Sequence, residues 1–447
     1  MPVLAKLCIV LGLLGTIVGV AIFVSALLWS GSMETELEQI RAVQREAGEP
    51  VTLEELDAWY PQVPDAENAA LLYEDIFTEL EAIDPEGTRV EALRDATEEY
   101  EQIGDYPVEH REALKTFVAD AEPALALLEA AVVRPKARFP IDLSEGMEAE
   151  LPHLSKMRNA VRVLYLSSEA ALLNGNKALA VERHATILPV GGALLAEPGL
   201  LPQLVRGAIN GISFRALERL VNHTQFDEEL LRQLDAAYAA AYHPEALQRA
   251  LLGERCMAAD TIRRVYDGTL NSDSGLFREI RDKLVSNPVL VGSYGRYEQL
   301  TVYAAFETML PGVDPDWPTI ATPLHDGAEP DTSGAILASI LLPSISRAPI
   351  YFVRYIAYLR SARTAIAVER YRLAHGTAPD SLEDCVPEFL DVVPEDPYDG
   401  EAIRYQRESE GYVIYCVFDD LDDDGAVPWT RDDDRIVDGD LVFRVTR

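Results

Sequence analysis

The residues best suited to chemistry form an acidic loop near the carboxyl end, Asp420-Leu-Asp-Asp-Asp-Gly425. Asp420, Asp422 and Asp424 alternate along the chain, so their carboxylates can converge while Gly425 takes the sharp turn. Hard oxygen ligands of this kind favour calcium over transition metals. Carboxylates gathered in one turn repel each other unless a cation neutralises them, so we expect a structural calcium site. The alternative is a solvated acidic loop without an ion.

The loop departs from an EF-hand in two respects. Its twelfth position is Arg431 instead of a bidentate acid, and a strand instead of a helix leads into it. Acidic residues on the returning segment are available to complete the site. They are Asp432, Asp433, Asp434, Asp438 and Asp440.

A catalytic set is not recognisable in the sequence. The histidines form no H-x-H or H-E-x-x-H pattern, and no nucleotide-binding glycine motif occurs. The segment Gly292-Ser293-Tyr294-Gly295 falls short of the G-x-S-x-G elbow of hydrolases. Glu254, Cys256 and Asp260 share one predicted helix, but nearby arginines offer them structural ion-pair partners. The sequence therefore predicts no catalytic residues and no cofactor besides calcium.

An apolar run of 23 residues without a charge, Leu7 to Trp29, predicts the location of the protein. At helical rise it is long enough to cross a hydrocarbon core about 30 Å thick. Lys6 precedes this run and several glutamates follow it, which places the amino end in the cytoplasm and the bulk of the chain outside. The alternative is a cleaved signal peptide, because Ser30-Gly31-Ser32 offers small residues for cleavage.

Composition narrows the classes of partner. The chain has 447 residues, and 75 Asp and Glu against 39 Lys and Arg give it a formal charge of −36. This charge repels phosphate backbones and anionic lipid surfaces, so nucleic acid is not an expected partner. Four cysteines are too few for a disulfide framework. Cys385 and Cys416 fall in the same terminal module. The sequence allows either a disulfide bridge between them or two buried free thiols.

Apolar residues recur at spacings of three and four from Met33 to about Leu342, which predicts a helical array. The first clear helix is expected to start at Asp65 as its N-cap, and Ser272 to Gly334 are expected to form a long loop. Further helices are predicted over Val90 to Ile103, Glu109 to Val132, Met147 to Leu173, Lys177 to Leu195, Leu200 to Asn222, Glu228 to Tyr242 and Pro244 to Tyr266.

Two of these helices, joined by Asn174-Gly175-Asn176 and ended by Pro198, resemble a tetratricopeptide hairpin. The resemblance covers one unit and no copy recurs at a fixed period, so an irregular array is the prediction. Another long helix is expected from Ile350 to His375. The period then changes to strands over Glu401 to Gln406, Gly411 to Phe418 and Asp440 to Val445. A small antiparallel sheet packed against the long helix is the economical arrangement.

The sequence thus predicts a mainly α protein with three parts. Residues 1–32 form the membrane anchor, residues 33–334 the extracytoplasmic helical domain, and residues 335–447 the long helix with a small α+β module.

The terminal module resembles the globular end of the major, G-type pseudopilins of type II secretion. The matching positions are Tyr371, Gly376, Pro379, Leu382, Val386, Pro387, Pro394, Asp396, Pro397, Gly400, Ile403, Tyr405 and the stretch from Tyr412 to Gly425. The resemblance implies a calcium loop after the strand, with Asp420 on a ligand position. Met1 to Leu28 lacks the family's basic leader and the glutamate that follows its cleavage site, so no prepilin processing is implied.

The whole chain looks like bacterial envelope proteins that carry this module. The leading hypothesis is a single-pass protein of the bacterial inner membrane, acting in scaffolding or protein binding, with envelope proteins as partners. One alternative is an envelope hydrolase whose acidic residues meet only in the fold. The other is a component associated with type II secretion pseudopilins.

Overall fold

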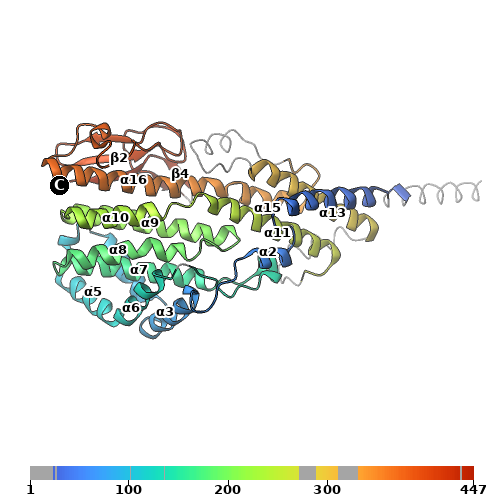
Figure 1. Cartoon of the computed structure of the whole chain (residues 1–447), viewed down its shortest axis with the longest axis horizontal. Coiled ribbons are helices and arrows are strands. Elements are labelled where there is room, and N and C mark those ends of the chain that lie inside the picture. The colour runs from blue at the N-terminus through green and yellow to red at the C-terminus, as the bar shows by residue number, and fades with distance from the viewer. Residues whose placement is uncertain are drawn as a thin grey trace, which may run out of the picture.

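The computed structural model describes residues 24–25, 28–100, 102–134, 136–270, 288–310, 331–432 and 435–447. Over these residues the chain is mainly helical, with a small antiparallel sheet near its carboxyl end (Figure 1). This confirms the predicted fold class at that level. No helix among the described residues is long and apolar enough to cross a membrane. Most of the predicted span, residues 7–29, lies outside the described part of the chain.

A helix over residues 28–46 precedes the labelled elements. The α-helices are α2 Leu53–Trp59, α3 Ala69–Ile83, α4 Thr88–Glu98, α5 Val108–Asp120, α6 Glu122–Val132, α7 His153–Leu173, α8 Lys177–Gly192, α9 Leu200–His223, α10 Glu228–Ala240, α11 Glu245–Asp267, α13 Pro288–Met309, α15 Leu337–Ser346 and α16 Ala348–His375. The short 3-10 helices are η1 Ile103–Asp105, η2 Leu143–Glu148 and η4 Leu382–Cys385.

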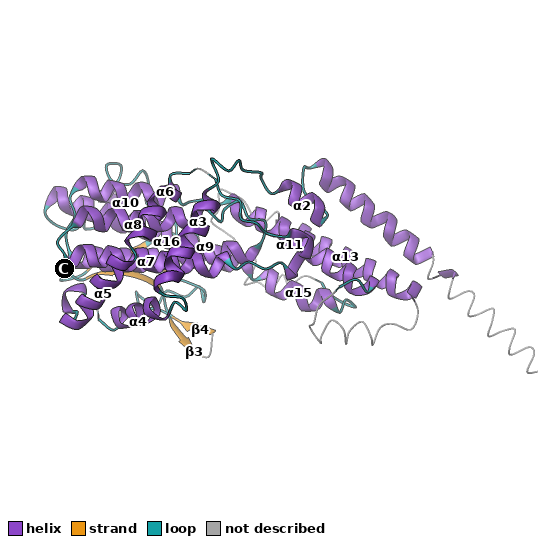
Figure 2. Cartoon of the chain, turned by 90° about the horizontal axis from the view of Figure 1, so that it is seen from below, coloured by secondary structure: helices purple, strands orange, loops and turns teal. Residues whose placement is uncertain are grey.

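The helices form an elongated molecule in which α3 to α10 gather at one end and α2, α11, α13 and α15 at the other (Figures 1 and 2). Helix α16 lies along the first group: α9 and α10 contact it on one side, and the sheet lies on the other. Contacts between Arg206 and Tyr355 and between Phe214 and Tyr358 show that α9 and α16 run in the same direction. The two predicted parts of the chain therefore share one long interface.

The strands are β1 Arg404–Arg407, β2 Tyr412–Cys416, β3 Thr430–Asp432, β4 Arg435–Asp438 and β5 Leu441–Val445. Strands β1, β2 and β5 form an antiparallel sheet in the order β1-β2-β5, and β3 pairs with β4 in a separate ribbon. In the sheet, Ile414 faces Tyr405 on one neighbour and Phe443 on the other. Phe443 packs edge-on against Phe214 of α9, so the sheet and the helices share one hydrophobic core.

Several predicted boundaries are wrong. The first clear helix begins at Ala69 with Asn68 as its N-cap, not at Asp65, because the Asn68 amide also binds the backbone of Arg138 across the fold. The helix predicted from Glu109 to Val132 is two helices, α5 and α6. Helix α13 lies within the predicted long loop. Of the remainder of that stretch, residues 272–287 and 311–330 lie outside the described part of the chain.

Candidate anion-binding cavity

The acidic loop brings together two of its three predicted ligands. Carboxylate oxygens of Asp420 and Asp424 lie within 4.8 Å of each other and of Asp438, which ends β4. Asp422 is not part of this group: Leu421 has a left-handed backbone, φ 62°, which turns the chain between Asp420 and Asp422. The alternation read from the sequence is therefore broken, and Asp438 from the returning segment takes the third place.

Charge repulsion is visible in this trio. Desolvation and then the charges of Asp438 and Asp420 raise the pKa of Asp424. Beneath the loop, Asp440 is buried; its Oδ2 accepts the N–H of Ala426 at 2.7 Å, and its Oδ1 has no hydrogen-bond partner. Desolvation raises the pKa of Asp440 to about 6. The described carboxylates are thus arranged to gain from a cation.

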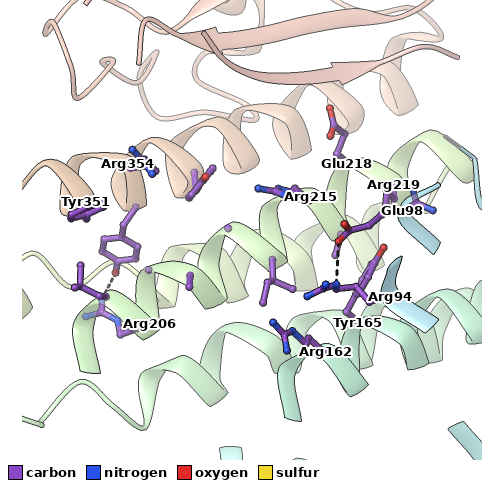
Figure 3. A pocket seen from close by; sticks show the side chains of 18 of the residues that line it. Arg94, Glu98, Arg162, Tyr165, Arg206, Arg215, Glu218, Arg219, Tyr351 and Arg354 are labelled. Carbon is purple, nitrogen blue, oxygen red and sulfur yellow. Dashed lines mark hydrogen bonds and ion pairs between the residues drawn. The ribbon is translucent and has the colours of Figure 1, made fainter. Parts of the chain in front are cut away.

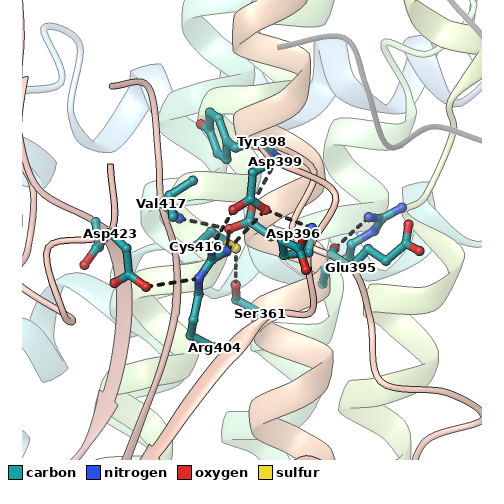
Figure 4. Close-up of polar contacts among 12 residues, drawn as sticks. Ser361, Glu395, Asp396, Tyr398, Asp399, Arg404, Cys416, Val417 and Asp423 are labelled. Carbon is teal, nitrogen blue, oxygen red and sulfur yellow. Dashed lines mark hydrogen bonds and ion pairs between the residues drawn. The ribbon is translucent and has the colours of Figure 1, made fainter. Parts of the chain in front are cut away.

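A buried aspartate holds the terminal module together (Figure 4). Asp396 accepts the N–H groups of Tyr398 and Val417, both at 2.9 Å, and the guanidinium of Arg404 at 2.7 Å. Desolvation raises the pKa of Asp396, and the two N–H groups partly oppose that rise. The residue ties its loop to the end of β2, which is a structural task. Cys416 lies beside this network and, like Cys385, is a buried free thiol, so no bridge joins them.

A cavity of about 1120 Å³ is bordered by α4, α7, α9, α16 and the last strand, β5 (Figure 3). The charge of its lining is positive, whereas the net charge of the chain is negative. Two glutamates, Glu98 and Glu218, line it against seven arginines. The arginines are Arg94, Arg162, Arg206, Arg215, Arg219, Arg354 and Arg444. In a chain of charge −36 this concentration of cations needs an explanation.

Most of these arginines are held by partners within the fold. Arg219 pairs with the buried carboxylate of Glu169 at 2.6 Å. The other pairs and stacks are distributed as follows: Arg94 with Asp95, Arg206 with Gln203 and the Tyr355 ring, Arg354 with Asp419, and Arg444 with Glu408. These five side chains have structural roles that account for their presence.

Arg162 on α7 and Arg215 on α9 are different. Neither forms an ion pair with a carboxylate of the described residues, and no dashed line reaches either of them in Figure 3. Burial, followed by repulsion from Arg94 and Arg158, lowers the pKa of Arg162. Arg215 is exposed to the cavity and contacts the hydroxyl of Tyr358. Glu91 and Glu98 attract Arg162, and Glu218 attracts Arg215, but none of these carboxylates forms an ion pair with them, so both guanidinium groups can still receive an anion.

Packing brings these two arginines to the same stretch of the cavity. His153 and Glu197 bind each other at 3.0 Å near the beginnings of α7 and α9, and Glu169 and Arg219 meet near the ends. The two helices therefore run in parallel. Counting along them places Arg162 level with residues 209–212, within about two helical turns of Arg215.

The floor of the cavity is a face of α9 made of small residues, Gly207, Ala208 and Gly211. A Cβ placed on Gly207 would meet no atom within 4 Å, so the space above it is open. Aromatic side chains of α16 form the adjoining wall: Tyr351, Phe352, Tyr355 and Tyr358. The cavity thus combines a cationic region with an apolar one.

Glu218 lies at the cationic end of this cavity. Its carboxylate accepts the backbone N–H of Arg444 at 2.7 Å, and desolvation raises its pKa to about 7. Near neutral pH this side chain is therefore poised between a neutral and an anionic form. Its state alters the charge that a bound anion meets.

Comparisons of the chain with protein-family models, with curated proteins and with solved structures gave no match. The cavity consequently has to be interpreted from its own chemistry. Sequence reasoning missed it because its arginines are spread from Arg94 to Arg444. A local signal of the cavity was present in the sequence. Gly207 and Gly211 stand eight and four residues before Arg215, and glycines inside a long helix often have a packing or functional reason.

Proposed function

We propose that the protein binds an anionic small molecule in the arginine-lined cavity, with Arg162 and Arg215 receiving its charge. The observation that carries this proposal is that both guanidinium groups lack a carboxylate partner among the described residues. Carboxylates are abundant in this chain, yet none of the described ones contacts these two cations, and an anion bound between them would offset the desolvation of the partly buried Arg162. Arginine also binds carboxylates and phosphates through two parallel hydrogen bonds, which gives specificity.

The sequence supplies the setting for this binding. The apolar run from Leu7 to Trp29 would anchor the chain in the bacterial inner membrane and hold the helical domain outside the cytoplasm. The terminal module would then have a supporting role, because Arg444 of its last strand and Thr446 just after that strand line the cavity. This is a binding protein in the envelope, in keeping with the scaffolding or partner-binding role expected from the sequence.

We also propose that Asp420, Asp424 and Asp438 hold a structural calcium ion. The convergence of their oxygens within 4.8 Å and the raised pKa of Asp424 support the assignment, because a cation would relieve the repulsion among them. Oxygen donors of this hardness suit calcium. Binding would tie the loop after β2 to the ribbon formed by β3 and β4.

The anion proposal is tested by calorimetric titration of the full chain, held in phosphatidylcholine nanodiscs, with inorganic phosphate and pyrophosphate at low salt. We expect saturable binding that weakens about tenfold or more in Arg162→Gln and in Arg215→Gln, since a charged hydrogen bond contributes roughly 1.5–3 kcal/mol. Arg158→Gln is the matched control: it removes an exposed arginine one turn away that does not line the cavity. Unchanged affinity in the double variant would overturn the proposal.

A further inference from the structure

We infer that the ligand is an anionic amphiphile, with a phosphate or carboxylate head between Arg162 and Arg215 and an apolar tail along α9 toward Phe352 and Tyr355. This inference rests on the proposed anion binding and adds the chemical class of the ligand. It is carried by the uneven distribution of charge and apolar surface along the cavity.

The first step concerns the cations at the apolar end. Arg206 donates to Gln203 at 2.7 Å and lies 4.7 Å from the centre of the Tyr355 ring. Arg354 pairs with Asp419 and lies over the Phe418 ring. The charge of Arg354 is therefore compensated by a carboxylate, and the guanidinium of Arg206 is occupied by neutral hydrogen-bond and ring partners. What this end offers to a ligand is aromatic and aliphatic surface.

The second step concerns the shape of the floor. Between Leu204 and Arg215, α9 advances about 17 Å. Over that distance the floor of the cavity is made by Gly207 and Ala208, which carry at most one side-chain carbon, and by the Tyr358 ring, which packs on Gly211 at 3.2 Å from the position of a Cβ. The result is a channel whose floor consists of small residues and the face of an aromatic ring. An extended alkyl chain fits such a channel, because it needs contact surface and no polar partners.

The third step excludes the simplest competitor, an extended acidic peptide. A peptide placed along α9 would bring one N–H and one C=O per residue, and each loses free energy when buried without a partner. Of the α9 residues that line the cavity between Leu204 and Ile212, only Arg206 has a hydrogen-bonding side chain, and Gln203 and Tyr355 already occupy it. The hydroxyls of Tyr351 and Tyr358 on α16 are fewer than the N–H and C=O groups of an extended peptide. The alkyl chain is the occupant that the channel favours.

The test compares octyl phosphate with inorganic phosphate, both titrated calorimetrically into the full chain in phosphatidylcholine nanodiscs, with empty nanodiscs subtracted. We expect octyl phosphate to bind at least about tenfold more tightly, since burial of only two methylenes gives that factor. Gly207→Phe should remove this gain by filling the open space, so that octyl phosphate binds this variant no more tightly than phosphate does. Gly192→Phe, at the end of α8, is the matched control, because a Cβ there also meets nothing within 4 Å and Gly192 does not line this cavity.

The outcomes separate the two levels of the proposal. Equal affinities for octyl phosphate and phosphate would overturn the amphiphile and leave anion binding standing. Failure of both probes to bind would overturn both. A gain that survives in Gly207→Phe would also overturn the placement of the tail along α9. Nanodiscs that contain phosphatidic acid identify the source: competition with octyl phosphate indicates a lipid drawn from the bilayer, and no competition indicates a free amphiphile.

Discussion

Glu218→Gln should make the stability of the protein less dependent on pH. The wild-type carboxyl has its pKa raised from 4.5 to about 7, chiefly by desolvation. The folded state therefore retains a proton that the unfolded chain releases between these two values. By linkage, the free energy of unfolding falls as pH rises from about 4.5 to about 7, because the folded state binds more protons over that interval.

The size of the effect follows from the shift. A difference of 2.5 pKa units between the folded and unfolded states corresponds to about 3 kcal/mol. Glutamine cannot ionise, but its carbonyl oxygen can still accept the N–H of Arg444, which is 2.7 Å from the carboxylate in the wild type. The variant should therefore match the wild type at low pH. At about pH 8 it should be more stable by up to about 3 kcal/mol.

Urea denaturation followed by circular dichroism, at a series of pH values, measures this difference. Other carboxyl groups titrate in both proteins, so the quantity to plot is the variant's unfolding free energy minus that of the wild type. Glu229→Gln provides the control, because it removes an exposed carboxylate on α10. A difference that stays constant across the pH series would refute the reasoning about Glu218.

Three further outcomes are expected. Glu169→Ala should cost about 3–5 kcal/mol in urea denaturation, because it leaves the Arg219 guanidinium without its carboxylate; Glu169→Gln, which keeps an acceptor, should cost less, and equal losses would contradict this account. Calcium titrated calorimetrically should bind more weakly to Asp420→Asn with Asp424→Asn than to Asp422→Asn, since Asp422 stands outside the trio, and identical affinities would remove the site. On a Cys8→Ser background the three buried thiols should react with a thiol reagent only on unfolding, and rapid labelling of the native protein would show the described burial to be wrong.

The sequence predicted best what depends on continuous local patterns. Helices α8 to α11 begin and end within a few residues of the predicted limits, because each carries an unbroken apolar stripe between turn residues. The sheet strands were also placed correctly by their alternation. The predicted helix boundaries were wrong where a proline or a hydrogen bond to a distant residue determines the end of the helix. Pro123 starts α6 and separates it from α5, and Asn68 is selected as a cap by its bonds to Arg138.

The candidate cavity could not be predicted in the same way, since its lining comes from segments far apart in the chain. In the sequence Glu169 follows Arg162 by seven residues and Glu218 follows Arg215 by three, so nothing marks either arginine as lacking a carboxylate partner. Only the packing of α7 along α9 shows that both are left without a carboxylate in one hollow. The acidic loop was partly accessible from sequence, but the third member, Asp438, depended on the return of β4.

Net charge and local potential are separate properties of this molecule. The formal charge of −36 argues against association with nucleic acid or anionic surfaces, because such partners meet the outer face of the protein. Charges more than about 8–10 Å from a site are largely screened at physiological salt. A small anion inside the cavity therefore responds mainly to the arginines that line it. An acidic exterior is therefore compatible with a cationic cavity. The negative net charge does not exclude an anionic ligand inside that cavity.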